Sequence, residues 1–381
     1  MKELGYRLFA VMYFIFKWLP IKKNSSFLIM THDDGPEGNV AMVASYMEEH
    51  YYTTSVRLTR KDTEFSGEGK IKKAFTFFVI KAWHMARAEY IFMDNAFLPM
   101  AFLRIRKKTT VVQLWHGTGT IKKFGQDSNT GKLYEQEKRA NENIDYVIVN
   151  SPATRELYAG CFSVPLEKVQ ILGLPRTDLL FDEVELRSRC EKFYCQYPDM
   201  KGKKLVLYAP TFRDQEVNDP KVHLDVEKMA KELPEDYCLG LRLHPFVASR
   251  FHLEQDYDGK VVDFSSYDNL NTLLMATDLL ISDYSSIIFE YCVFGRPMIF
   301  YAYDLEEFSD HGRGFYRDYK SYVPGPVVKT TDEILEVIRK KDYKLDRLHE
   351  FFEESYQYKD GMSSARLVNF LVSQKSEDTL L

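Results

Sequence analysis

Two histidines, His116 and His244, each stand directly after a short apolar stretch that predicts a buried strand. Imidazole has a pKa close to neutral, so a histidine in such a loop can accept or donate a proton during catalysis. A single histidine after a strand is more often structural than catalytic. Two such histidines occur here, and Thr211 and Arg213 follow a third predicted strand. Together these residues predict a site assembled from loops at one sheet edge.

The segment Ser282-Asp283-Tyr284-Ser285-Ser286 follows a fourth strand and opens a helix. Serine and aspartate are good helix caps, and the free backbone N–H groups of a helix start also bind phosphate oxygens. Plain capping explains one such residue. Three serines and an aspartate within five positions favour a phosphate site.

Two arginines and a glutamate extend the set of candidates. Arg213 and Arg242 carry planar guanidinium groups that suit phosphate oxygens. Arg242 precedes His244 by two positions, so we expect both side chains to point to the same face along a strand. Glu290 lies one turn after Ser286 and predicts either a contact with a ribose hydroxyl or an ordinary solvated side chain.

Short apolar segments alternate with helical patterns through the first half of the chain. The predicted strands are 26–30, 55–58, 90–93, 109–114, 145–149 and 169–172. A helical pattern follows the first strand over 39–50, and another covers 70–88. This alternation predicts a parallel sheet with helices on both faces.

The alternation restarts after a charged stretch, 181–203, which we interpret as a linker. The later predicted strands are 204–208, 237–243, one beginning at 261–262, 279–282 and 298–301, with Gly295 as the stop of a helix before the last of them. The chain has 381 residues, more than the roughly 250–300 at which a single core stops growing. We therefore expect an α/β fold with two Rossmann-like, doubly wound domains facing a cleft.

The N-terminal segment Leu8–Leu19 (LFAVMYFIFKWL) is apolar and interrupted only by Lys17. It is shorter than the roughly 20 residues of a transmembrane helix, and no small-residue cleavage site follows it. One helical face holds Leu4, Leu8, Val11, Met12, Ile15 and Leu19. This pattern predicts an interfacial helix on an anionic membrane surface, and the alternative is a helix packed on the protein's own core. The basic runs 104–108 and 122–123 are either solvated or in contact with anionic lipid.

These patterns give four predicted parts of the chain. They are an N-terminal membrane-associating helix (1–23), an N-terminal Rossmann-like domain (24–180), a C-terminal Rossmann-like domain (181–340) and C-terminal helices (341–381).

The composition narrows the class of protein. Lys plus Arg number 51 and Asp plus Glu 56, a net charge of −5, which argues against a dedicated nucleic-acid binder. The five cysteines are odd in number and contain no CxxC pair, so we expect neither a disulfide framework nor a Cys-rich zinc site, and we expect a reducing compartment.

Two motifs are misleading. Gly117-Thr118-Gly119 has Lys122 where a dinucleotide fingerprint needs a third glycine. The stretch 31–36 (THDDGP) resembles the signature of metal-dependent polysaccharide deacetylases, but none of the nine histidines has a partner four positions away to complete a metal site. We therefore expect no metal ion and no cofactor.

Five linked motifs resemble the CDP-glycerol glycerophosphotransferases of teichoic acid synthesis. They are QLWHGTGTIKKFG (113–125), YAPTFRD (208–214), LRLHP (241–245), SDYSSIIFEYCVFGRPMIFY (282–301) and RGFYRDY…VPGP (313–326). The stretch YKDGMSSAR (358–366) resembles the same family, and the order of the motifs is the family's own.

The resemblance implies a GT-B architecture and a monotopic protein on the cytoplasmic face of the cell membrane. It implies a CDP-glycerol donor, bound mainly by the C-terminal domain (181–340). It also implies an acceptor saccharide linked to undecaprenyl diphosphate, with the N-terminal domain (24–180) as the acceptor domain. His116 matches the family's catalytic histidine, which we take as the general base, and His244 matches its second essential histidine. The predicted pyrophosphate contacts are Thr211, Arg213, Ser282, Ser285 and Ser286, and the predicted ribose or other donor contacts are Asp283, Glu290 and Arg242.

Several alternatives stay open. CDP-ribitol in place of CDP-glycerol keeps the fold and mechanism and changes only a few pocket side chains. A nucleotide-sugar epimerase or ordinary glycosyltransferase of GT-B type would not release CMP, and a lipid-carrier binding protein without activity would not need both histidines. The length of the chain favours addition of one or a few units over polymerisation, because no residues are left for a domain that follows a polymer.

Overall fold

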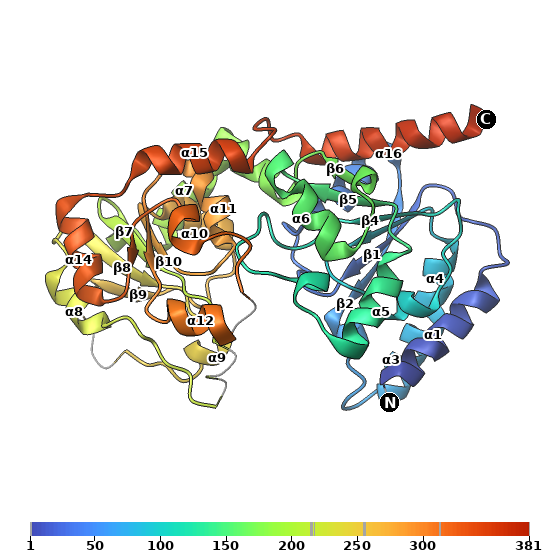
Figure 1. Cartoon of the computed structure of the whole chain (residues 1–381), viewed down its shortest axis with the longest axis horizontal. Helices are drawn as coiled ribbons and strands as arrows, with labels where there is room; N and C mark the ends of the chain where they lie inside the picture. The colour runs from blue at the N-terminus through green and yellow to red at the C-terminus, as the bar shows by residue number, and fades with distance from the viewer. Residues whose placement is uncertain (1, 214–215, 217, 254–256, 312–313, 381) are drawn as a thin grey trace. The chain divides into compact units, whose positions relative to one another are not determined.

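The computed structural model describes residues 2–213, 216, 218–253, 257–311 and 314–380 (Figure 1). The chain divides into two compact units. Unit 1 consists of Met1–Thr118, Lys123–Asp178 and Ser355–Leu381, and unit 2 consists of Gly119–Lys122 and Leu179–Glu354. The chain therefore passes between the units four times.

The sheet of unit 1 has six parallel strands. Their bounds are β1 (Ser25–Met30), β2 (Thr54–Thr59), β3 (Tyr90–Met93), β4 (Thr110–Gln113), β5 (Tyr146–Val149) and β6 (Val169–Ile171). They pair in the order β2-β1-β3-β4-β5-β6. All six strands were predicted from the sequence to within one residue at each end, so the expected parallel α/β sheet is confirmed.

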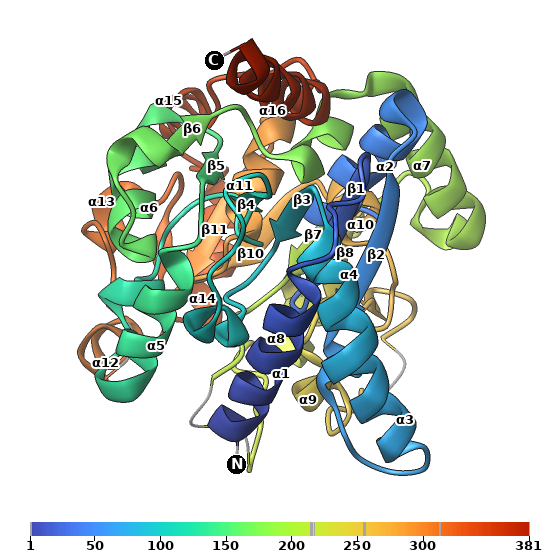
Figure 2. The ribbon, with the colours of Figure 1, turned by 90° about the vertical axis from the view of Figure 1, so that its right-hand side faces the viewer.

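Helices cover both faces of this sheet, as right-handed crossovers in opposite directions require. The helices of unit 1 are α1 (Lys2–Phe16), α2 (Asn39–Tyr51), α3 (Lys70–Phe75), a π-helical turn (Thr76–Lys81), α4 (Ala82–Arg87), α5 (Gly131–Asn141), α6 (Pro152–Phe162) and α16 (Ser363–Leu380). Its short 3₁₀ helices are Arg60–Thr63, Leu98–Phe102, Gly125–Asp127 and Leu166–Lys168, and another, Pro175–Phe181, runs on into unit 2. Helix α16 lies beside α2 (Figure 2), and both pack on the side chains of Leu28, Met30 and Phe92.

The sheet of unit 2 also has six parallel strands. Their bounds are β7 (Lys204–Tyr208), β8 (Tyr237–Leu241), β9 (Val261–Asp263), β10 (Leu279–Ser282), β11 (Met298–Tyr301) and β12 (Val327–Val328). They pair in the order β12-β11-β10-β7-β8-β9, the strand order of a dinucleotide-binding Rossmann fold. The sequence predicted five of them, and β12 was missed because two residues carry no periodicity.

The helices of unit 2 are α7 (Glu183–Gln196), α8 (Val226–Glu232), α9 (Pro245–Ala248), α10 (Leu270–Ala276), α11 (Ile287–Tyr291), α12 (Leu305–His311), α13 (Tyr319–Tyr322), α14 (Thr331–Lys340) and α15 (Leu345–Ser355), with 3₁₀ helices Pro198–Met200 and Cys292–Phe294. Gly295 ends the segment after α11 with a φ of 62°, as predicted. The expected linker 181–203 was wrong in part, because Asp182 caps α7 and Phe193 buries its ring completely.

The C-terminal segment 341–381 does not form one part of the molecule. Helix α15 lies in unit 2 up to Glu354, and the chain then returns to unit 1. There Leu367, Val368 and Leu371 of α16 are buried in the core on the sheet. The apolar positions of both helices are visible in the sequence, but the sheet that each one covers is not.

Each sheet has one switch point, where neighbouring strands lead to connections that run in opposite directions. In unit 1 it lies between β1 and β3, and in unit 2 between β7 and β10. Ligands of doubly wound folds bind outside the carboxyl ends of the strands at these points. The predicted site residues after β7 and β10 therefore stand at the switch point of their sheet.

Candidate functional site

His116 lies just beyond the carboxyl end of β4. Its Nδ1–H donates to the backbone carbonyl of Asp94, 2.9 Å away, because a carbonyl oxygen can only accept. In the neutral ring Nε2 then carries the lone pair. The residue before it, Trp115, has a φ of 56°, a left-handed conformation that a bulky side chain adopts only under constraint.

Asp94 also holds the loop that follows β1. Its carboxylate accepts the backbone N–H groups of Thr31, His32 and Asp33 over 2.8–3.3 Å. The side chain of Asp94 is 2% exposed, and burial raises its pKa to about 6 even though these three N–H groups favour the charged form. One residue therefore orients His116 through its main chain and the β1 loop through its side chain.

His32, from the β1 loop, stacks on His116. The two imidazole centroids are 3.5 Å apart, with 14° between the ring planes. Burial lowers the pKa of His32, and Asp33 raises it while Arg176 lowers it further. The sequence analysis placed His32 only inside a misleading motif. Its position directly after the first strand was the available signal.

Two further residues hold the backbone around His116. The guanidinium of Arg176 donates to the His116 carbonyl over 2.6 Å. The backbone N–H of Arg176 donates to the side-chain oxygen of Asn39 over 2.9 Å. Asn39, at the start of α2, donates in turn to the carbonyl of Trp115 over 3.0 Å. These contacts, all within unit 1, fix the turn that carries His116.

An aspartate has the same arrangement at the switch point of unit 2. Asp283, directly after β10 and 1% exposed, accepts the backbone N–H of Thr211, from the loop after β7, over 2.8 Å. It also accepts the N–H of Tyr284 and pairs with Arg213 over 2.8 Å. Asp283 therefore joins the two loops, a structural role that the prediction of a donor contact did not include.

Arg213 lies between two carboxylates. Its Nε and Nη2 donate to Asp304 over 2.7 and 3.0 Å, and its Nη1 donates to the carbonyl of Thr211 and pairs with Asp283. Since a guanidinium has five N–H groups, at most two remain for a phosphate. Arg213 was predicted to bind pyrophosphate, and in the structure it also neutralises two largely buried acids.

The serine-rich turn divides into buried and accessible parts. Ser282 is 1% exposed and donates to the carbonyl of Ala209, whereas Ser285 and Ser286 are half-buried at the start of α11. Glu290 is 6% exposed, so the alternative of an ordinary solvated side chain is wrong. Only Ser285 and Ser286 of the three serines are open to a ligand here.

His244 differs from His116 in its hydrogen bonding. It caps α9, and its Nδ1 accepts the backbone N–H of Phe246 over 3.3 Å. In the neutral ring Nε2 therefore carries the proton. Strand β8 ends at Leu241, so the alternation that was expected to bring Arg242 and His244 to one face does not apply. Arg242 instead donates to the carbonyls of Phe264, Ser265 and Tyr267.

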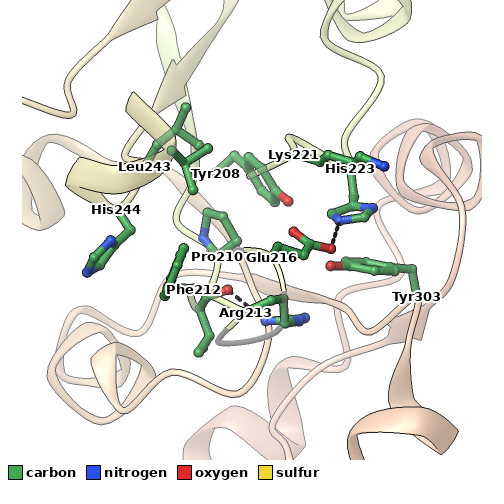
Figure 3. Close-up of a pocket in the computed structure, with 12 residues that line it drawn as sticks. Tyr208, Pro210, Phe212, Arg213, Glu216, Lys221, His223, Leu243, His244 and Tyr303 are labelled. Carbon is green, nitrogen blue, oxygen red and sulfur yellow. Dashed lines mark hydrogen bonds and ion pairs between the residues drawn. The ribbon is translucent and has the colours of Figure 1, made fainter. Parts of the chain in front are cut away.

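A pocket of unit 2 opens beside His244 (Figure 3). It is lined by Tyr208, Pro210, Thr211, Phe212, Arg213, Glu216, Lys221, His223, Leu243, His244, Val247 and Tyr303. His223 pairs with Glu216 over 2.7 Å and stacks on Tyr303, and sequence reasoning missed all three residues because they belong to no recognised motif. Asp214 and Arg313, which belong to the motifs quoted above, lie outside the described residues.

Within the described part of the chain, no group of three or more His, Cys, Asp or Glu side chains is placed to hold a metal ion. All five cysteines are free. No helix among the described residues is both long and apolar enough to cross a bilayer.

The chain is a two-unit α/β protein with one six-stranded parallel sheet in each unit. A solved wall teichoic acid polymerase, TagF, has a similar fold. One TagF variant structure superposes with a TM-score of 0.81 at 20% identity and covers 99% of this chain and 94% of that one. A UDP-GlcNAc 2-epimerase from Neisseria meningitidis shares the fold less closely, with a TM-score of 0.56 at 14% identity over 92% of this chain and 100% of the other.

The chain belongs to the CDP-Glycerol:Poly(glycerophosphate) glycerophosphotransferase family, whose sequence model matches residues 11–373. The predicted family is thereby confirmed. A teichoic acid poly(ribitol-phosphate) polymerase of Bacillus spizizenii is 34% identical over 99% of this chain and 61% of its own length. A teichoic acid poly(glycerol phosphate) polymerase of the same organism is 29% identical over 97% of this chain and 98% of its own length.

The chain spans 52–61% of the length of three of the ribitol-phosphate polymerases it matches. It covers almost the whole of the second relative, which is named a polymerase. The length of the chain therefore gives no reason to prefer addition of a few units over polymerisation.

Replacing Asp94 by Asn should change how stability depends on pH. Asp94 releases its proton near pH 6 in the folded chain and near 3.8 when its pKa is unperturbed, so between these values the folded state holds more protons and its stability falls as pH rises. The free energy of unfolding of the unaltered protein, relative to the Asp94→Asn protein, should fall by up to about 3 kcal/mol from pH 4 to pH 7. Urea titrations at each pH measure it.

The control is Asp199→Asn, which removes an exposed carboxylate of unit 2. Its difference from the unaltered protein should change by no more than about 0.5 kcal/mol over the same range. A pH-independent difference for Asp94→Asn would mean that Asp94 is solvated in the folded chain.

Replacing Arg213 by Met leaves the carboxylates of Asp283 and Asp304 without their shared cation. Because Asp283 is buried, the free energy of unfolding should fall by about 3–5 kcal/mol. Arg187→Met is the matched control, since its pair with Glu183 leaves both side chains about 80% exposed and should contribute less than about 1 kcal/mol. Equal costs in denaturant titrations would contradict a buried cluster.

Proposed function

We propose that the protein transfers an alditol phosphate from a CDP-alditol to a hydroxyl group of a lipid-linked acceptor and releases CMP. Family membership supports the donor class, and the hydrogen bonding of two histidines supports the chemistry. His116 donates from Nδ1 and keeps a basic Nε2, whereas His244 accepts at Nδ1 and keeps an Nε2–H donor. This difference between the two rings is the observation on which the proposal depends.

In the proposed reaction the acceptor hydroxyl attacks the phosphorus next to the alditol, and His116 Nε2 takes its proton. A new P–O bond forms while the phosphoanhydride bond to CMP breaks, and CMP leaves with the electron pair. His244 offsets charge on the phosphoryl oxygens from its Nε2–H, and it can do so in its neutral form. Ser285 and Ser286 add donors at the start of α11.

Two donors are candidates. CDP-glycerol follows from the name of the family and from the resemblance of the motifs. CDP-ribitol is supported by relatives named as ribitol-phosphate polymerases or primases, which are 34–36% identical to this chain. The proposal includes the GT-B arrangement of two domains facing a cleft, a saccharide on undecaprenyl diphosphate as acceptor, and a place at the cytoplasmic face of the cell membrane.

Helix α1 supports the membrane part of the proposal. Phe9 and Tyr13 are its buried side, and Phe9 packs against Phe77 and Phe97. The other side of α1 and the two residues Trp18 and Leu19 beyond its end leave large apolar side chains between 40% and 82% exposed. On the helix these are Leu4, Leu8, Val11, Phe14 and Ile15. The inner side agrees with the interpretation of a helix packed on the protein's own core, and the outer side suits a lipid surface.

Neighbouring elements extend this apolar face and add positive charge. The π-helical turn packs against α1, and α3, which leads into that turn, exposes Ile71 and Phe75 (Figure 1). Lysines 70, 72 and 73 stand on α3, and the basic run 104–108 adjoins the end of α1, where Lys17 donates to the Arg104 carbonyl. Apolar side chains beside basic ones favour an anionic membrane as the occupant.

Incubating the protein with CDP-glycerol or CDP-ribitol and a soluble lipid-linked disaccharide analogue tests the function. CMP release and the mass of the product identify the donor and the number of units added. His116→Ala should lower turnover at least ~10²-fold and leave donor binding nearly unchanged, because the base acts only in the chemical step. His349→Ala, an exposed histidine of α15, is the control. Undiminished turnover in His116→Ala would exclude the base assignment.

The double substitution Val11→Glu and Ile15→Glu tests the membrane face. Each native side chain gains about 1.5–3 kcal/mol when fully buried in lipid, so partitioning onto phosphatidylglycerol vesicles should weaken at least ~10-fold. Val184→Glu, at an exposed position of α7, should have no effect. Flotation assays with phosphatidylglycerol and with neutral phosphatidylcholine vesicles separate the electrostatic from the apolar contribution to binding. Equal binding by the unaltered protein, the double variant and Val184→Glu would rule out α1 as the contact.

A further inference from the structure

The switch point of unit 1 holds a cluster that the proposed reaction does not use in full. His116 supplies the base, but its ring contacts a second imidazole, His32, and the same residue, Asp94, holds both. Asp94 binds His116 through its carbonyl and the backbone of His32 through its carboxylate. Two chain segments that are 84 positions apart in sequence are thus fixed to one buried residue.

We infer that His32 is a positioning residue for His116. Its imidazole, held flat against that of His116, fixes the plane of the basic ring and so the direction of the Nε2 lone pair. This inference rests on the proposed function, in which His116 is the base. It assigns no contact between His32 and substrate.

A single hydrogen bond does not fix an imidazole ring. The hydrogen bond from Nδ1 to the Asp94 carbonyl limits rotation of the ring about its Cβ–Cγ bond. The plane of the ring can still tilt about the axis of that hydrogen bond. Stacking on His32 at 3.5 Å opposes that tilt, and the ring of Trp115, 4.0 Å away at 30°, gives a second contact. Small misplacements of a reacting group cost up to about 10²-fold in rate, so such constraint has catalytic value.

His32 is suited to support the base and not to replace it. Its burial and the positive charge of Arg176 favour the neutral ring, opposed by Asp33. A neutral ring does not repel the imidazolium that His116 becomes when it takes a proton, and its π face attracts that cation. The charges that act on the His32 ring include Asp33, from the same loop, and Arg176, which also donates to the His116 carbonyl. The Asp94 carboxylate accepts the backbone N–H of His32.

Two substitutions separate a ring that positions from a nitrogen that binds. His32→Ala removes the stacked ring, and His32→Phe keeps a flat ring without nitrogen. With CDP-glycerol or CDP-ribitol as donor, His32→Ala should lower kcat at least ~10-fold with the donor KM within about twofold, because only the base is misplaced. His32→Phe should recover kcat to within about threefold of the unaltered protein.

His50→Ala is the matched control. His50 stacks on Tyr46 with nearly the same geometry, 4.0 Å and 14°, but on the exposed surface of α2. It should leave kcat unchanged. Unchanged kcat in His32→Ala would overturn the inference, and so would a His32→Phe protein as slow as His32→Ala, because the nitrogen would then be the working part.

A second measurement does not depend on turnover. The ring protons of His116, observed by NMR with labelled histidine, should move to less shielded positions in His32→Ala and stay shielded in His32→Phe. Melting temperatures show whether each variant is folded. If the unaltered protein releases no CMP but the shielding behaves as expected, the proposed function fails and the stacked pair stands. If shielding is the same in His32→Ala and the unaltered protein, the stack is absent and the inference fails alone.

Discussion

A buried aspartate joins two loops at the switch point of each sheet. Asp94 in unit 1 and Asp283 in unit 2 follow different strands, yet each accepts backbone N–H groups from the loop after the neighbouring strand. A carboxylate in a place with little water needs such donors, and the loops gain a fixed shape by supplying them. The other features of the two sites, including the orientation of His116 and the position of Arg213, depend on loops held in this way.

The main chain selects the tautomer of both histidines in their neutral form. A carbonyl opposite Nδ1 of His116 and an N–H opposite Nδ1 of His244 give the two neutral rings opposite tautomers. These main-chain partners favour one tautomer of each ring whenever that ring is neutral. Residues of identical type can therefore perform different tasks in the proposed transfer.

Much of the fold could be predicted from the sequence, because buried parallel strands form short apolar runs that are easy to recognise. Eleven of the twelve strands were found in this way, and the loops after them contained the candidate residues. The failures concern contacts distant in sequence. Nothing near Asp94 or His32 indicates that they meet, Arg242 was assigned to a strand that ends one residue earlier, and the apolar side of α16 does not reveal which sheet it covers.

The return of α16 to unit 1 has a consequence for synthesis on the ribosome. Leu367, Val368 and Leu371 belong to the core on the first sheet, so that core stays incomplete until all of unit 2 has been translated. Unit 2, apart from the short insertion Gly119–Lys122, is continuous and can fold as soon as it emerges. Unit 1 is thus the first unit to be translated and the last to complete its core. Until α16 packs on the sheet, the apolar face that α16 covers stays exposed to chaperones.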